Sequence, residues 1–282
     1  MKRTAIILGI LSFAIWAGAQ TSGQAATQTP PAAGATTPAA KRPPQAKTQP
    51  EFDAYKAAAA SADGATMEKA ADDFATKFPD SELRVLIYKN TMRLYQNANN
   101  AEKTEAMGRK VIGLDGDDPE ALVTVAEVIA ERTHDTDIDK DQRFAEAIGM
   151  AQKATTTVDT DLQVPAGTPQ DKVDAYKGLL RSNAYSVIGT IEFKKDSFPA
   201  AQENLQKSID AYPSNPDPVV ILRLALTLDK QQKYAEALKV ANRAVEMTQD
   251  NTPIGTPARR ERDRLQQLTG GAAPAAQTPP KN

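Results

Sequence analysis

The feature that most constrains this chain is the recurrence of apolar and small residues at helical spacing between residues 51 and 269. Short polar turns interrupt the pattern, and no segment shows the strict alternation of a half-buried strand. The clearest stretch spans residues 185–213, where the spaced positions hold Tyr185, Ile188, Gly189, Ala201, Leu205, Ser208 and Pro213. Residues three and four apart share one face of a helix. The sequence therefore predicts an all-α fold of paired helices.

Each residue type in this stretch has a physical reason. Gly189 and Ala201 are small, which lets two antiparallel helices approach to about 8–10 Å between their axes. Tyr185 and Ile188 are large enough to fill the remaining space between the helices. Pro213 has no backbone N–H to donate, so the second helix ends there.

The pattern resembles the tetratricopeptide repeat (TPR), a helix–turn–helix unit that stacks into a solenoid. Matching positions recur downstream at Tyr234, Ala237, Ala241 and Ala244. The resemblance implies about five units across residues 51–249 and a closing helix over residues 257–269, whose polar face points outward. An irregular helical bundle is the alternative.

The first residues, 1–19, have the pattern of a signal peptide. Lys2 and Arg3 precede an apolar run, and small residues at Ala17 and Ala19 provide a cleavage site. The run is too short to span a bilayer at about 1.5 Å per residue, so we predict no stable membrane insertion after cleavage. An uncleaved anchor is the alternative. The chain is therefore predicted to be exported, to the periplasm or the extracellular space.

The segments that flank the helical domain differ from it in composition. Residues 20–50 are rich in Ala, Pro, Thr and Gln and lack acidic residues, and residues 270–282 are similar. Because such segments bury too little apolar area to offset their ordering entropy, we predict a disordered tether and tail. All 36 acidic residues lie within residues 51–269, with all but six of the 34 basic ones. A net-acidic domain argues against nucleic acid as a partner.

The sequence offers little for catalysis. Cysteine is absent, and the single histidine, His134, lies in a polar insertion. No glycine-rich phosphate loop, nucleophile elbow or paired-histidine motif is present. We therefore predict no catalytic residues, no enzymatic activity and no cofactor.

One acidic pattern in the insertion could be a metal-binding loop or an ordinary solvated loop. Asp135, Asp137, Asp139 and Glu146 stand at positions 1, 3, 5 and 12 of a twelve-residue loop, which is the carboxylate spacing of an EF-hand. Position 6 holds Lys140, where the tight turn needs glycine. We favour a solvated acidic loop and no metal site. The alternative is a Ca²⁺- or small-ligand-responsive binding protein that uses residues 133–146.

The TPR resemblance also implies which residues face a partner, because first helices line the concave groove of such solenoids. By register, the groove holds a basic end, an acidic middle and a polar stretch, formed by Lys89, Arg93, Asn97, Glu127, Glu131, Thr190 and Lys194. At the far end, residues 220, 224 and 228 are apolar. We expect the closing helix to cover them as core.

These observations lead to one functional prediction. The chain is predicted to be an exported, non-enzymatic scaffold that binds a protein or peptide partner in the concave groove. The close of the first unit, around residues 74–81, is similar to endings found in cell-envelope TPR proteins, which suggests a role in envelope assembly.

Overall fold

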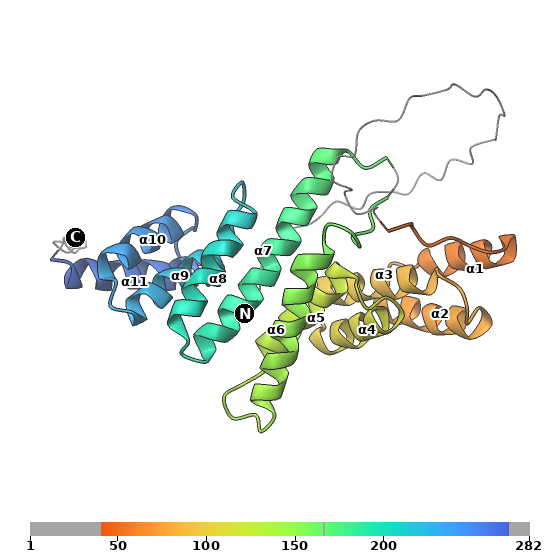
Figure 1. Ribbon diagram of the computed structural model, residues 1–282, viewed down its shortest axis with the longest axis horizontal. Coiled ribbons are helices and arrows are strands. Elements are labelled where there is room, and N and C mark those ends of the chain that lie inside the picture. The colour runs from red at the N-terminus through yellow and green to blue at the C-terminus, as the bar shows by residue number, and fades with distance from the viewer. Residues whose placement is uncertain (1–40, 166, 271–282) are drawn as a thin grey trace, which may run out of the picture.

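The computed structural model describes residues 41–165 and 167–270, and these residues form an all-α solenoid (Figure 1). The predicted signal peptide, most of the predicted tether and nearly all of the predicted tail lie outside the described residues. The described helices are α1 Gln49–Ala59, α2 Gly64–Lys77, α3 Arg84–Asn97, α4 Ala101–Leu114, α5 Pro119–Arg132, α6 Lys140–Thr157, α7 Gln170–Lys194, α8 Phe198–Ala211, α9 Pro218–Lys230, α10 Tyr234–Glu246 and α11 Gly255–Leu268.

The helices pack in chain order. Each helix contacts the next one along the chain, from α1 and α2 at one end of the row to α11 at the other, and the long helix α7 crosses the middle (Figure 1). Five pairs, α1–α2 to α9–α10, correspond to the five predicted units, and α11 closes the row. The prediction of an all-α TPR-type solenoid is therefore confirmed.

The local sequence explains where the helices start and turn. The side chains of Thr48, Asp63, Asn100, Asp118 and Asp217 each accept a hydrogen bond from a backbone N–H in the first turn of the helix that follows.

The turns inside three of the units share one backbone geometry. Asn99, Asp196 and Gln232 each lie between a first and a second helix and have φ values of 54°, 57° and 61°. A left-handed residue at this point ends the first helix and reverses the chain. The same three-residue turn therefore recurs in units two, four and five.

The core consists of three main clusters along the row. The first lies between α1 and the start of α5, the second joins α5, α6 and α7, and the third joins α8 to α11. Val220, Leu224 and Leu228 are buried in the third cluster, to which Ala258 and Leu265 of the closing helix also belong. The expectation that these three apolar residues are core is confirmed.

The small residues lie at the helix contacts. A Cβ placed on Gly189 would lie 2.8 Å from Leu205 Cγ and 3.1 Å from the Leu205 backbone nitrogen. Ala201 is fully buried on α8, and the Ser208 hydroxyl donates a hydrogen bond to the Ser182 carbonyl oxygen at 2.7 Å. Ala237, Ala241 and Ala244 are also fully buried. Tyr185 and Ile188 pack in the second cluster, and Pro213 follows the end of α8.

The N-terminal boundary differs from the prediction. The first helix begins at Gln49, two residues before the expected domain start, and residues 41–48 contact the turns of several units. The predicted tether therefore does not extend to residue 50. Composition alone suggested a tether there because the segment has almost no bulky residue, whereas its contacts are polar.

Candidate binding surface on the first helices

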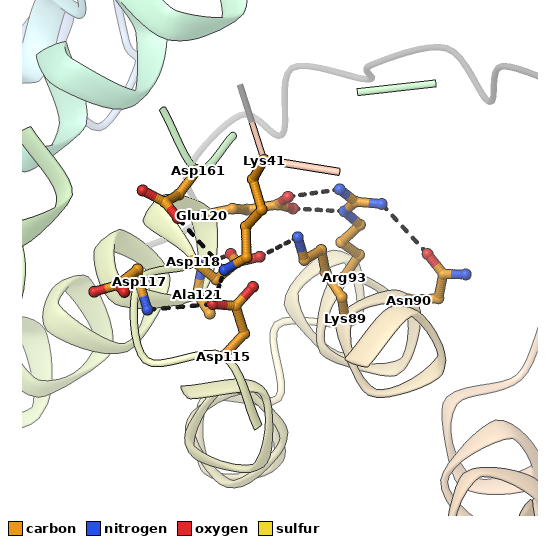
Figure 2. Close-up of polar contacts among 10 residues, drawn as sticks. All are labelled: Lys41, Lys89, Asn90, Arg93, Asp115, Asp117, Asp118, Glu120, Ala121 and Asp161. Carbon is orange, nitrogen blue, oxygen red and sulfur yellow. Dashed lines mark hydrogen bonds and ion pairs between the residues drawn. The ribbon is translucent and has the colours of Figure 1, made fainter. Parts of the chain in front are cut away.

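The predicted basic end of the groove lies on α3, and the structure places Lys89 inside the domain. Its side chain forms an ion pair with Asp118, and both side chains are almost fully buried (4% and 0% exposed). Asp118 also caps α5 by accepting a hydrogen bond from the Ala121 backbone N–H at 2.9 Å (Figure 2). Burial raises the pKa of Asp118, and the nearby Lys89 ammonium opposes that rise. The prediction that Lys89 lines an open groove is therefore wrong.

Arg93 lies one helical turn further on and keeps 44% of its side chain exposed. Its guanidinium donates two hydrogen bonds to the Glu120 carboxylate at 2.5 and 2.6 Å and one to Asn90 at 3.3 Å (Figure 2). Burial alone would raise the pKa of Glu120, but Arg93 outweighs burial and holds that pKa below its usual value. The charge of Arg93 is therefore neutralised by a carboxylate of the next unit.

Tyr176 of α7 completes this group. Its hydroxyl lies near the Arg93 guanidinium and the Glu120 carboxylate, and burial together with that carboxylate raises the pKa of Tyr176 well above the usual value. Three first helices, α3, α5 and α7, thus meet at one polar cluster. The groove does not have the predicted basic end, because Lys89 and Arg93 each face an acid from unit three.

Two further predicted groove residues also contact other helices. The Lys194 ammonium donates hydrogen bonds to the carbonyl oxygens of Ala130 and Thr133 at 2.6 and 3.0 Å, which satisfies the C-terminal end of α5. Burial and the neighbouring Arg223 lower the pKa of Lys194. Arg223 of α9 in turn donates a hydrogen bond to the Thr190 hydroxyl at 2.8 Å. Lys194 therefore connects unit four to unit three, and Thr190 connects unit four to unit five.

The remaining predicted residues lie nearer the solvent. Asn97 and Glu131 are exposed at the C-terminal ends of α3 and α5, and Glu127 is half-buried on α5. These three side chains belong to first helices of adjacent units.

Two open surface depressions lie away from these residues. One, of about 450 Å³, lies over α8 and the α9–α10 turn, where its lining includes Gln202, Gln206 and Gln231. The other, of about 480 Å³, lies between the start of α10 and the end of α11. None of the predicted groove residues lines either depression.

The acidic insertion does not assemble an EF-hand. Asp135 pairs with Lys140 at 3.5 Å, and Asp137 accepts a hydrogen bond from the His134 backbone N–H. Asp139 precedes α6, and Glu146, on that helix, binds Arg109 of α4 at 2.6 Å. Within residues 41–165 and 167–270, no three acidic or histidine side chains come together as a metal site. Asp135, Asp137, Asp139 and Glu146 therefore do not converge as a Ca²⁺-binding loop in the described part of the chain.

Sequence reasoning missed Glu120 and Tyr176. Glu120 follows Asp118 and Pro119 at a helix start, where an acidic residue is ordinary because it favours the helix dipole. Tyr176 lies in the N-terminal extension of α7, which the repeat pattern does not cover.

No helix in the described ranges is long and apolar enough to cross a membrane.

Comparisons with known proteins agree with this fold. No family model and no curated protein sequence matches the chain. Among solved structures, PilF of Pseudomonas aeruginosa superposes with a TM-score of 0.54 at 15% identity, over 79% of this chain and 87% of that chain. MamA has a TM-score of 0.48 at 17% identity, over 70% and 88%. YrrB, described as a TPR protein with an unusual peptide-binding site, has a TM-score of 0.45 at 16% identity, over 71% and 85%. The structural neighbours are TPR proteins, and this likeness concerns the fold.

Proposed function

We propose that this chain is an exported, non-enzymatic scaffold that binds a protein or peptide partner on the concave side formed by its first helices, in the service of envelope assembly. The repeat fold supports a scaffold role, because stacked helix pairs offer an extended surface on which a partner can bind. The signal-peptide pattern of residues 1–19 supports export.

The observation that carries the proposal is that the cationic side chains of the first helices are engaged by groups of the domain itself. Arg93 is held by Glu120, and Lys194 is held by the carbonyl oxygens at the end of α5. Exposed polar groups such as the Asn97 amide are then the groups available to a partner. An amide both donates and accepts hydrogen bonds, as the backbone of an extended peptide does. Recognition is therefore proposed to depend on main-chain and neutral polar contacts more than on the cations of the first helices.

Capture from an envelope extract tests where the partner binds. Asn97→Arg combined with Glu131→Arg changes the first-helix surface without touching the buried ion pairs. Gln152→Arg combined with Glu102→Arg makes the same two chemical changes at exposed positions of second helices. A specific partner should be lost with the first pair and retained with the second. Equal recovery with both variants would refute the proposed location.

Export has a separate test. The full chain and a chain without residues 2–19 are expressed in a Gram-negative host, and the cells are fractionated. The full chain should leave the cytoplasm, and sequencing of its new N-terminus should show cleavage after Ala19. Retention of the full chain in the cytoplasm would remove the envelope part of the proposal and leave the binding surface to its own test.

A further inference from the structure

Residues 41–48, which we call the strap, run along the inter-unit turns of the first half of the solenoid. The segment precedes α1 in the chain and also contacts residues of units two and three. Its polar contacts reach the α2–α3 turn, the α4–α5 turn and the chain after α6, at residues 80–82, 115 and 160–161. Three successive turns are thus joined by one short segment.

Lys41 makes the contacts at the far end of the strap. Its ammonium lies 2.5 Å from Asp115 Oδ1 and 3.4 Å from an oxygen of Asp161 (Figure 2). Its backbone N–H donates to the Thr160 carbonyl oxygen at 2.8 Å. The side chain of Lys41 is 34% exposed and that of Asp115 is 9% exposed. This end of the strap is therefore a partly buried ionic contact between residues far apart in sequence.

The middle of the strap contacts Glu82. Arg42 donates a hydrogen bond to one carboxylate oxygen at 2.7 Å, and the backbone N–H of Gln45 donates to the other at 3.1 Å. Pro43 and Pro44 lie between these two donors. Consecutive prolines favour an extended backbone, so less conformational entropy is lost when the segment docks.

The near end of the strap joins the start of α1. The Lys47 backbone N–H and the Ser81 hydroxyl both donate to the Glu51 carboxylate, at 2.7 and 2.5 Å. The Lys47 ammonium donates to the Asp80 carbonyl oxygen at 2.8 Å. Glu51 is itself buried, so the beginning of α1 depends on these donors.

The first helix of unit one, α1, has few buried residues to hold it. Only Glu51 and Ala58 of α1 are buried, whereas α5 buries nearly its whole length. In a solenoid each unit ordinarily contacts only its neighbours, so a weak terminal unit frays without affecting the others. The strap departs from this rule because it ties unit one to the turn that follows unit three.

We propose that the strap is a conformational clamp. It locks the first three units into one block, sets the curvature of that block, and releases unit one when its ionic contacts are broken. The strap brings Lys41, Arg42 and Lys47 to turns that carry Glu82, Asp115 and Asp161, so charge complementarity selects this path. Screening of the ionic contacts at high salt releases the clamp. The proposal stands without the proposed function, because it concerns motion within the chain.

Native-state hydrogen exchange on the full chain tests the clamp. Lys41→Ala with Arg42→Ala removes two strap cations. Lys56→Ala with Lys69→Ala removes two exposed cations of unit one that pair only within their own helices. Amides of α1 and α2 should exchange about fivefold faster in the strap variant, as the loss of partly exposed ion pairs implies, and at the wild-type rate in the control. Amides of α9 and α10 should be unaffected in both.

The acceptor side and the curvature give independent readouts. Asp115→Asn with Asp161→Asn leaves the strap sequence intact and should reproduce the faster exchange. Because the chain contains no cysteine, spin labels can be placed at Ala57→Cys and Gln152→Cys without other changes. The distance distribution between α1 and α6 should broaden when the strap cations are removed or when salt is raised. Unchanged exchange with an unchanged distribution would overturn the clamp, and so would equal acceleration in every helix.

Discussion

Lys89 and Asp118 form an ion pair from which solvent is excluded, with the lysine on a first helix and the aspartate at the start of the next unit's first helix. The pair therefore connects units two and three through their interior. A buried ion pair contributes little net stability when both partners are present, but it is costly to break from one side.

Lys89→Met should destabilise the domain by about 3–5 kcal/mol, because it leaves the Asp118 carboxylate buried without a cation. Lys89→Met with Asp118→Asn should recover most of that loss, since the asparagine keeps the helix cap and carries no charge. Urea denaturation followed by circular dichroism measures both changes. Lys69→Met, at an exposed lysine, is the control. A loss from Lys89→Met no larger than the control's would contradict the buried-pair interpretation.

Glu120→Gln should weaken the domain by about 2 kcal/mol at neutral pH, because a charge-assisted pair with Arg93 is lost. The folded-state pKa of Glu120 lies below its unfolded value of about 4.3, so its contribution is complete above that pH and is lost as the pH falls through the folded pKa. The difference in melting temperature between wild type and variant should therefore shrink from pH 6 to pH 3. A constant difference across this range would show that Glu120 does not titrate with folding. Glu203→Gln, at an exposed glutamate, should stay near the wild type throughout.

Two glycines provide a matched test of helix packing. Gly189→Ala should destabilise the domain by about 1–3 kcal/mol, because the added methyl group meets Leu205 at its backbone and side chain. Gly149→Ala lies on the open face of α6, where nothing lies within 4 Å of the added carbon. It should stabilise the domain by up to about 1 kcal/mol through helix propensity. Thermal unfolding of both variants gives the comparison, and effects of the same sign would argue against the close approach at Gly189.

Calcium should not stabilise this protein. Asp135 and Asp137 are engaged separately, and Glu146 binds Arg109 on another helix. Millimolar Ca²⁺ should leave the melting temperature unchanged, and calorimetric titration should give no binding heat. A calcium-dependent rise that disappears in Asp135→Asn with Asp137→Asn would restore the acidic loop as a metal site.

The sequence predicted the solenoid well because its strongest signal is local. Gly189, Ala201 and Leu205 lie within seventeen residues of each other, and the sizes of their side chains indicate how closely α7 and α8 pack. The charges of the first helices were harder to predict. Arg93 finds its partner 27 residues away at the start of another helix, and nothing local distinguishes Glu120 from an ordinary residue of a first turn.

The strap was missed for a related reason. Its composition is that of a tether, and its acceptors, Glu82, Asp115 and Asp161, lie in three different turns. Each acceptor alone is typical of an acidic loop. The three acceptors come to lie beside the basic segment only when the units stack. The strap can therefore be predicted only after the arrangement of the units is known.

The recurring left-handed residue at Asn99, Asp196 and Gln232 has an evolutionary consequence. Because each of these residues reverses the chain within a single helix pair, a unit built around such a turn carries its own folding signal as a self-contained cassette. Duplication or deletion of one cassette would change the length of the protein while leaving the turn geometry inside the remaining cassettes intact.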